Sequence, residues 1–149
     1  MRKKLLKPKH FIMSYNWEHN TVLVAEDDAL NFRYIELLLA RRTSIRILWA
    51  KDGKEALKIC NEDDSVDIVL LDLQLPEMDG ITTLKAIKKI NPYLPVIIQT
   101  ANSWNNEEEN CLQAGADGFF NKPLNIDELL EFMENCITIH PKEKHWKVD

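Results

Sequence analysis

Short runs of branched apolar residues alternate with amphipathic segments along this chain, and this alternation constrains the fold more than any other feature of the sequence. Five such runs occur, at 21–25, 45–50, 67–72, 95–101 and 116–121. Repeated strand–helix units build a parallel sheet whose two faces are covered by helices. The sequence therefore predicts an α/β fold with five such units.

The segments between the runs predict helices, whose inward faces follow from the 3.6-residue period. In residues 29–41 the apolar positions at helical spacing are Leu30, Tyr34, Leu37 and Leu38. Residues 51–60 open the second helix. We expect the third and fifth helices to turn inward Ile81, Leu84, Ile87 and Ile90, and Ile126, Leu129, Leu130 and Met133. Ser103 and Asn125 are suited to cap the fourth and last helices.

Length and composition indicate one globular domain. The chain has 149 residues, of which 45% are hydrophobic, and a net charge of -5. This is enough to build a core, and no apolar run reaches the length of a membrane span. The charge gives no general attraction to nucleic acid. The three cysteines form no CxxC pair and leave an odd one, which favours reduced thiols in a cytoplasmic protein.

Polar side chains stand where the predicted strands end, at the edge where ligands bind in such sheets. They are Glu26, Asp27, Asp28, Asp72, Thr100 and Lys122. If the first and third strands are neighbours, Asp27 and Asp72 meet, and like charges about 4 Å apart repel by a few kcal/mol at intermediate dielectric. A cation must then lie between them. Carboxylate and carbonyl oxygens suit Mg²⁺, which keeps several waters and needs few protein ligands.

The same residue types form a receptor for a phosphoryl group. A carboxylate beside Mg²⁺ can act as a nucleophile and form an aspartyl phosphate, while a lysine and a hydroxyl group bind the transferred oxygens. Each residue alone has an ordinary explanation: Thr100 as a strand residue, Lys122 as a surface amine, residues 26–28 as a helix cap. Their combination at four strand ends favours phosphoryl chemistry, with Asp72 as the nucleophile.

Four motifs carry a resemblance to a known family. VLVAEDD, LLDLQLPEMDG, IIQTAN and AGADGFFNKPL, in this order and spacing, resemble the receiver domain of two-component response regulators over residues 20–138. The resemblance implies a flavodoxin-like fold with a five-stranded parallel sheet of order 2-1-3-4-5. We expect residues 1–19 to be a basic tail and residues 139–149 a second tail. The second is too short for an output domain, which predicts a stand-alone receiver.

The resemblance also implies the phosphorylation site and its metal. Asp72 is the phosphoacceptor, and Glu26 and Asp27 form the acidic pair for Mg²⁺. Asp72 itself and the main-chain carbonyl of Gln74 complete the protein ligands. Such a protein is a signalling switch rather than an enzyme.

Further roles follow for residues around this centre. Thr100 and Lys122 contact the phosphoryl group, and the Lys122–Pro123 bond is commonly cis in the family. Phe119 matches an aromatic position that changes rotamer on activation, and a core aromatic is the alternative interpretation. The neutral amides Gln74 and Asn102 occupy the positions that tune hydrolysis of the aspartyl phosphate, which predicts intermediate persistence.

The implied partners are proteins. The donor is a histidine kinase or a histidine phosphotransfer protein, which docks on the first helix near Asn31 and near Pro123; a solvent-facing helical asparagine is the alternative for Asn31. The downstream target is an unidentified protein, with no direct contact to nucleic acid or membrane. Gly118 and an acidic last helix depart from the pattern of receivers that dimerise through this face, so we expect a monomer when unphosphorylated.

Three other functions are disfavoured. A phosphatase of the haloacid-dehalogenase type needs a second aspartate two residues after the nucleophile, where this chain has Gln74. A nucleotide-binding switch needs a glycine-rich phosphate loop, and the four glycines do not cluster. A scaffold that works without phosphorylation would not need the acidic pair, Asp72, Thr100 and Lys122 together.

Overall fold

The structure, a computed structural model, describes residues 14–101 and 106–139. In this part of the chain five strands and five helices alternate. The strands are β1 (Thr21–Ala25), β2 (Arg46–Ala50), β3 (Ile68–Asp72), β4 (Val96–Thr100) and β5 (Gly118–Asn121). The helices are α1 (Ala29–Arg42), α2 (Gly53–Glu62), α3 (Gly80–Ile90), α4 (Glu107–Gln113) and α5 (Ile126–Ile139). All strand pairs are parallel, in the order β2-β1-β3-β4-β5, so the predicted fold and strand order are confirmed.

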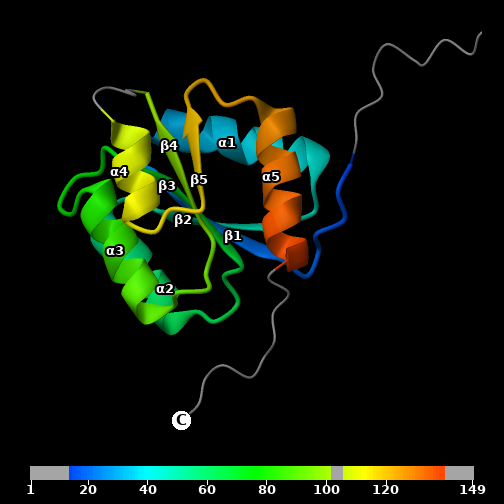
Figure 1. Ribbon diagram of the computed structural model, residues 1–149. Coiled ribbons are helices and arrows are strands. Elements are labelled where there is room, and N and C mark those ends of the chain that lie inside the picture. Colours follow the sequence, from blue (N-terminus) through cyan, green and yellow to red (C-terminus); the bar gives the residue numbers. More distant parts are fainter. Residues whose placement is uncertain (1–13, 102–105, 140–149) are drawn as a thin grey trace, which may run out of the picture.

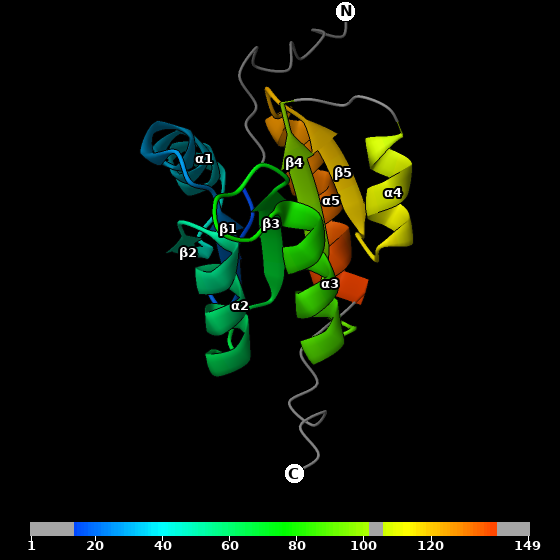
Figure 2. The same ribbon diagram turned by 90° about the vertical axis from the view of Figure 1, so that its left-hand side faces the viewer.

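The sheet lies between two helical layers. Helices α1 and α5 cover one face, and α2, α3 and α4 cover the other (Figures 1 and 2). Each face has its own apolar cluster, because alternate residues of a strand point to opposite faces. Every residue of β1, β3 and β4 is buried, as expected for the central strands of a sheet covered on both sides.

The inward face of α1 differs from the prediction. Its buried residues are Phe32, Ile35 and Leu39, and they pack in the cluster shared with α5. Of the four residues expected on this face, Leu30 is 81% exposed, Tyr34 is 50% exposed, Leu37 is also exposed and Leu38 is half-buried. The helix carries apolar residues on two faces, and the expectation selected the outer one.

Two helix ends also differ from expectation. Helix α4 begins at Glu107, so Ser103 is not its cap; the cap position is Asn106, in a left-handed conformation and without a side-chain cap hydrogen bond. Ser103 itself lies outside the described residues. Ile90, expected to face inward on α3, is exposed at the end of that helix, whereas Leu84 and Ile87 are buried.

The inward face of α5 and its cap agree with the prediction. Leu129, Leu130 and Met133 are buried, and Ile126 packs partly buried against the same cluster. The side chain of Asn125 accepts hydrogen bonds from the main-chain N–H groups of Asp127 and Glu128 at 3.1 and 3.2 Å. These bonds satisfy donors that the first turn of a helix leaves free.

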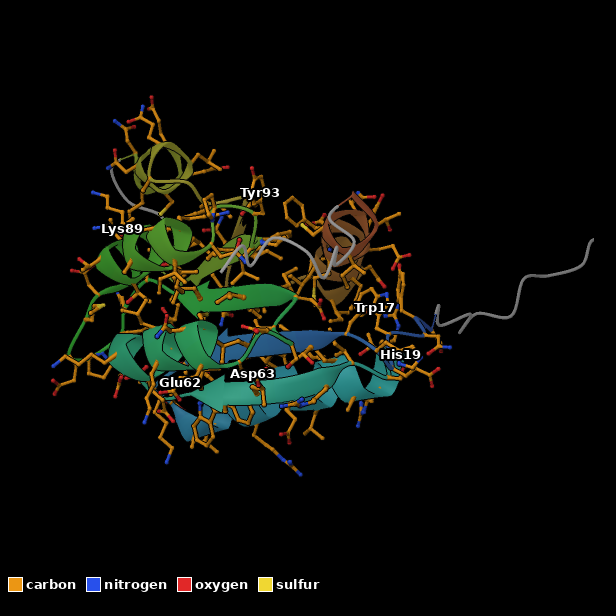
Figure 3. The ribbon with its side chains drawn as sticks, turned by 90° about the horizontal axis from the view of Figure 1, so that it is seen from below. Trp17, His19, Glu62, Asp63, Lys89 and Tyr93 are labelled. Carbon is orange, nitrogen blue, oxygen red and sulfur yellow. The ribbon has the colours of Figure 1, made fainter. Side chains whose placement is uncertain are left out.

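The segment before β1 packs against the domain. Trp17 is 4% exposed, within the cluster under α1 and α5, and its indole N–H donates to Glu134 of α5 at 2.6 Å. Figure 3 labels Trp17 on the α5 side of the sheet. Tyr15 lies beside the Trp17 ring and forms a β-bridge with Thr43. Trp146, in the second expected tail, lies outside the described residues.

The cysteines are free thiols on helices. Cys60, Cys111 and Cys136 lie on α2, α4 and α5 and form no disulfide. Burial raises the pKa of Cys60 to about 12 and the pKa values of Cys111 and Cys136 to about 11 each, so these thiols are protonated near neutral pH. Among the described helices, none combines the length and apolar composition that crossing a bilayer requires.

Candidate functional site

The strands deliver the predicted polar residues to one edge of the sheet. Glu26 follows β1, and its main-chain N–H donates to Ala50 at the end of β2. Asp72 ends β3, and Thr100 ends β4. Lys122 follows β5, and its main-chain N–H donates to the carbonyl of Thr100 at 2.8 Å. The main-chain hydrogen bonds of the sheet therefore fix where these side chains begin.

Three carboxylates meet at this edge. Glu26, Asp27 and Asp72 each place one carboxylate oxygen within 4.8 Å of the others. Glu26 is 1% exposed and Asp72 is 5% exposed, whereas Asp27 is exposed. Burial removes the water that would screen their mutual repulsion, so this arrangement requires cationic compensation.

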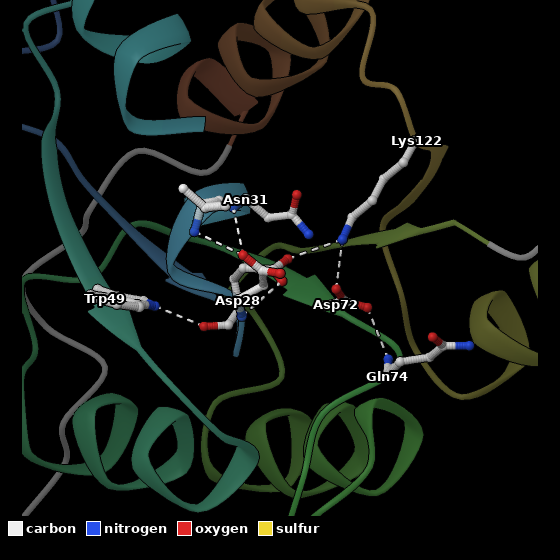
Figure 4. Close-up of polar contacts among 8 residues, drawn as sticks. Asp28, Asn31, Trp49, Asp72, Gln74 and Lys122 are labelled. Carbon is white, nitrogen blue, oxygen red and sulfur yellow. Dashed lines mark hydrogen bonds and ion pairs between the residues drawn. The ribbon is translucent and has the colours of Figure 1, made fainter. Parts of the chain in front are cut away.

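Lys122 supplies one cation. Its Nζ lies 2.7 Å from an Asp72 carboxylate oxygen and 3.0 Å from a Glu26 oxygen, as Figure 4 shows for the contact with Asp72. Burial alone would lower the pKa of Lys122, but the hydrogen bonds and charges of Asp72 and Glu26 outweigh it and raise the pKa. Burial and the neighbouring Asp72 raise the pKa of Glu26. Lys122 is thus held charged between two carboxylates.

The loop after β3 holds the Asp72 side chain from the other side. The main-chain N–H of Gln74 donates to Asp72 Oδ1 at 2.9 Å, while the Gln74 side chain is exposed (Figure 4). The loop then folds back, and Gly80 N–H donates to the carbonyl of Leu73. A Cβ atom at Gly80 would lie 2.5 Å from Leu73 Cα, so only glycine fits this close approach.

Trp49 on β2 holds the acidic loop after β1, and sequence reasoning did not identify it. Its indole N–H donates to the main-chain carbonyl of Glu26 at 2.7 Å (Figure 4). The ring stacks on Phe32 of α1 with centroids 4.4 Å apart, and Lys51 Nζ lies 5.1 Å from the ring centroid. A tryptophan near the end of a predicted strand was the only available signal, because the contact with Glu26 depends on the pairing of β1 with β2.

Asp28 and Asn31 lie where α1 starts at the same edge. The Asp28 side chain accepts hydrogen bonds from the N–H groups of Leu30 and Asn31 at 2.8 and 3.1 Å. Asp28 is therefore the helix cap, which was the ordinary explanation for part of this acidic run. Asn31 is exposed at the edge of the site.

The other predicted residues are placed as follows. Thr100 is fully buried at the end of β4. Phe119 on β5 is partly buried and packs against the cluster under α2, α3 and α4. Pro123 is exposed and its bond to Lys122 is cis. Asn102 lies outside the described residues.

The donor set fits a small hard dication. Three carboxylates share the site with one lysine, which leaves a net negative charge among the four side chains. Oxygen ligands of this kind are those that Mg²⁺ takes in proteins. Among the described residues no other group of carboxylates, histidines and cysteines converges in this way.

Comparisons with known proteins identify the family of this chain. The family model described as response regulator receiver domain matches residues 22–134. The transcriptional regulatory protein ZraR of Salmonella typhimurium is 38% identical over 122 residues, which cover 82% of this chain and 27% of that protein. The hybrid signal transduction histidine kinase I of Dictyostelium discoideum is 34% identical over 130 residues, or 82% of this chain and 7% of that protein. The chain thus spans about a quarter or less of these two relatives.

Solved structures show the same relationship. The receiver domain of the Francisella response regulator 1452 is 33% identical with a TM-score of 0.74, covering 80% of this chain and 98% of that one. The receiver domain of the sensor histidine kinase PA1611 from Pseudomonas aeruginosa, solved with a magnesium ion in its active-site cleft, is 30% identical with a TM-score of 0.73 and the same coverage. This chain belongs to the response regulator receiver domain family, whose members are signalling switches of two-component systems.

Proposed function

We propose that this chain accepts a phosphoryl group on Asp72 in a Mg²⁺-dependent reaction and then signals to a protein partner. One observation carries the proposal: Lys122 bridges Asp72 and Glu26 within a cluster of three carboxylates at the carboxyl edge of the sheet. A lysine with a purely structural role would need only one carboxylate partner, whereas here a single ammonium group lies in a cluster of three carboxylates.

The proposed reaction transfers the phosphoryl group from nitrogen to oxygen. A carboxylate oxygen of Asp72 forms a bond to phosphorus, the phosphorus–nitrogen bond of a phosphohistidine breaks, and the imidazole nitrogen leaves with the electron pair of that bond. Asp72 is oriented for attack by the Gln74 N–H at 2.9 Å. The ammonium of Lys122 neutralises negative charge on the transferred oxygens, and the hydroxyl of Thr100 donates to one of them.

Glu26, Asp27, Asp72 and the main-chain carbonyl of Gln74 would hold Mg²⁺. When bound, the ion would supply positive charge that stabilises the oxygens of the phosphoryl group. Trp49 contributes by fixing the Glu26 main chain through its 2.7 Å hydrogen bond. The neighbouring residue Asp27 then keeps a defined position at the mouth of the site.

The donor is proposed to be a histidine kinase or a histidine phosphotransfer protein that docks on α1. The outer face of this helix is apolar beside the site, because Leu30 and Tyr34 are exposed there. Asn31 and Pro123 lie at the same edge and are both exposed. A partner that covers this face would bring its phosphohistidine to Asp72.

Phosphorylation is proposed to favour one of two conformations of the domain, in which Thr100 moves toward the phosphoryl group and Phe119 changes rotamer. We infer that Gln74 and Asn102 set the lifetime of the aspartyl phosphate. Substituting both and measuring the rate of hydrolysis tests this, and an unchanged half-life would contradict it. A single Phe119 rotamer in structures with and without a phosphoryl mimic would contradict the switch.

The unphosphorylated protein is proposed to be a monomer. Glu128 and Glu131 are exposed on α5, where Asp127 is paired with Arg42 of α1, so two copies of the outer face of α5 would repel through the two glutamates. Sedimentation without a phosphodonor should give the monomer mass over a range of concentrations. A symmetric dimer that dissociates when these side chains are substituted would be the opposite result.

The phosphorylation proposal is tested with phosphoramidate, which carries the same phosphorus–nitrogen bond as phosphohistidine. The protein is incubated with it in the presence and absence of Mg²⁺, beside Asp72→Asn, and intact mass is measured. We expect a gain of one phosphoryl group that needs both Mg²⁺ and Asp72. No gain under any condition would favour a scaffold that works without phosphorylation.

A further inference from the structure

A crevice next to the acidic site has a buried amide at its floor. It has a volume of about 350 Å³ and opens between α1 and the segment that follows β5. Tyr34 and Ile35 of α1 form one wall, Pro123 and Leu124 form the other, and Gln99 of β4 lines the interior. This size lies within the range of small-molecule sites.

The Gln99 side chain is unusual for a central strand. It is fully buried, and neither its amide nitrogen nor its amide oxygen has a hydrogen-bond partner among the described residues. In β4 it points to the same face as Ile97, which packs in the apolar cluster of α1 and α5. The main-chain carbonyl of Gln99 accepts a hydrogen bond from Leu73 N–H. Both polar atoms of the side-chain amide lack such a partner among the described residues.

A buried donor and acceptor without partners destabilise a fold, and a methionine of similar shape would avoid that cost. Ile97, the neighbour of Gln99 on the same face of β4, is apolar, so this face of the strand does not need a polar side chain here. A group that enters the crevice and pairs with the amide would compensate its burial. The amide therefore points to a ligand.

The chemistry of the crevice defines that ligand. The Gln99 amide offers an N–H donor and a carbonyl acceptor side by side, and its complement is a group with the same two functions, as in another amide. The walls are apolar apart from the edge at Asn31 and Lys122. Because Lys122 is already paired with Asp72 and Glu26, the residues that line the crevice offer no unpaired positive charge to bind an anion. We propose that the crevice binds a compact, flat, neutral amide, a small carboxamide or lactam, through a paired hydrogen bond to Gln99.

The exposed rim explains how such a ligand would reach a buried floor. Tyr34 is 50% exposed and Asn31 is exposed, and neither packs in the apolar cluster of this face. These side chains can turn toward solvent without disturbing the core, and this movement admits the ligand. Once the ligand is bound, the ring of Tyr34 covers its flat face.

The test uses benzamide as the probe and the full chain, unphosphorylated and without Mg²⁺. Binding is followed by ¹H–¹⁵N NMR, in which the Gln99 side-chain signals are assigned by their loss in Gln99→Met. We expect benzamide to shift these signals together with those of Leu124, and Gln99→Met to weaken binding by about tenfold or more. Ethylbenzene, which lacks the amide, should bind the wild type more weakly than benzamide.

Two further variants complete the test. Tyr34→Ala removes a wall at an exposed position and should weaken benzamide binding without loss of the folded spectrum. Gln113→Met, the same substitution at an exposed residue of α4, is the control and should leave binding unchanged. Without ligand, Gln99→Met should raise the Tm, because it removes the unpartnered amide.

Three results would overturn the proposal. They are equal benzamide affinity in Gln99→Met and wild type, no shift of the Gln99 side-chain signals at the solubility limit of benzamide, and a Tm of Gln99→Met below that of wild type. The experiment contains neither phosphodonor nor metal. Its failure would therefore leave the phosphorylation of Asp72 untouched.

Discussion

Lys122 is the residue on which the electrostatic balance of the site depends. Its side chain is 20% exposed, while those of Asp72 and Glu26 are 7% and 1% exposed. Removing one partner of a buried ion pair leaves the other charges without compensation. Lys122→Met should lower the free energy of unfolding by about 1–3 kcal/mol, less than in a fully buried pair because the lysine keeps some solvent contact.

Urea unfolding at neutral pH measures this change, first without metal and then with Mg²⁺. Mg²⁺ should restore part of the lost stability, because it binds the folded state and replaces the missing cation. Lys54→Met is the control: its ion pair with Glu77 is exposed on both sides, and such pairs contribute about 0–1 kcal/mol. Equal effects of the two substitutions would contradict the assigned role of Lys122.

Trp49 is a second residue with a local prediction. Trp49→Phe retains a ring to stack on Phe32 but loses the hydrogen bond to the Glu26 carbonyl. Loss of a neutral hydrogen bond of about 0.5–1.5 kcal/mol corresponds to Mg²⁺ binding weakened by about twofold to tenfold. Isothermal titration calorimetry measures it. Trp17→Phe lies away from the acidic site and should leave the Mg²⁺ affinity unchanged, so a similar loss in both variants would exclude a specific positioning role.

Among the elements, α1 shows most clearly what periodicity can and cannot predict. Leu37 and Leu39 are both leucines of this helix, yet Leu39 is fully buried and Leu37 is 44% exposed. Leu39→Ala should lower the free energy of unfolding by about 2–5 kcal/mol, whereas Leu37→Ala should change it by less than about 1 kcal/mol. Chemical denaturation of the two variants measures the difference. Equal losses of the free energy of unfolding in the two variants would mean that α1 turns a different face toward the sheet.

The positions of the strands and helices follow from local sequence, whereas the face that each helix turns toward the sheet does not always do so. Strand positions, the Asn125 cap and the inward face of α5 could be predicted, because each depends on neighbouring residues. The face of α1 could not, because both of its sides carry apolar residues and only packing against the sheet selects between them. The start of α4 could not be predicted either, because it depends on the left-handed backbone conformation of Asn106, which the residue pattern did not indicate.

At the scale of the whole molecule, the strand order came from the resemblance of the four motifs rather than from the pattern of strands. Once the order is known, the meeting of Glu26, Asp27 and Asp72 follows from the adjacency of β1 and β3. The contacts of Trp49 and the burial of Gln99 join elements that are distant in sequence. Patterns of neighbouring residues do not predict contacts between distant segments, so these contacts were identified only in the three-dimensional structure.

The segment before β1 belongs to the stability of the whole domain. Trp17 joins the apolar cluster of α1 and α5 and donates to Glu134, which is 117 positions later in the chain. Trp17→Ala should therefore lower the free energy of unfolding by about 3–5 kcal/mol, the usual cost of truncating a buried aromatic residue. Tyr93→Ala, at a tyrosine that is 64% exposed, should change it by less than about 1 kcal/mol. Unfolding monitored by far-UV circular dichroism compares the two, and an unaffected Trp17→Ala would show that this segment does not support the fold.

Asp72 is the residue proposed to carry the phosphoryl group, and the most direct test of this proposal is to locate that group. The protein is phosphorylated with phosphoramidate and Mg²⁺ and reduced with borohydride, which converts an aspartyl phosphate to homoserine, and its peptides are sequenced by mass spectrometry. We predict homoserine at position 72 and unmodified residues at positions 26 and 27. Homoserine at position 27, or a phosphoryl group stable to reduction, would contradict the proposed mechanism.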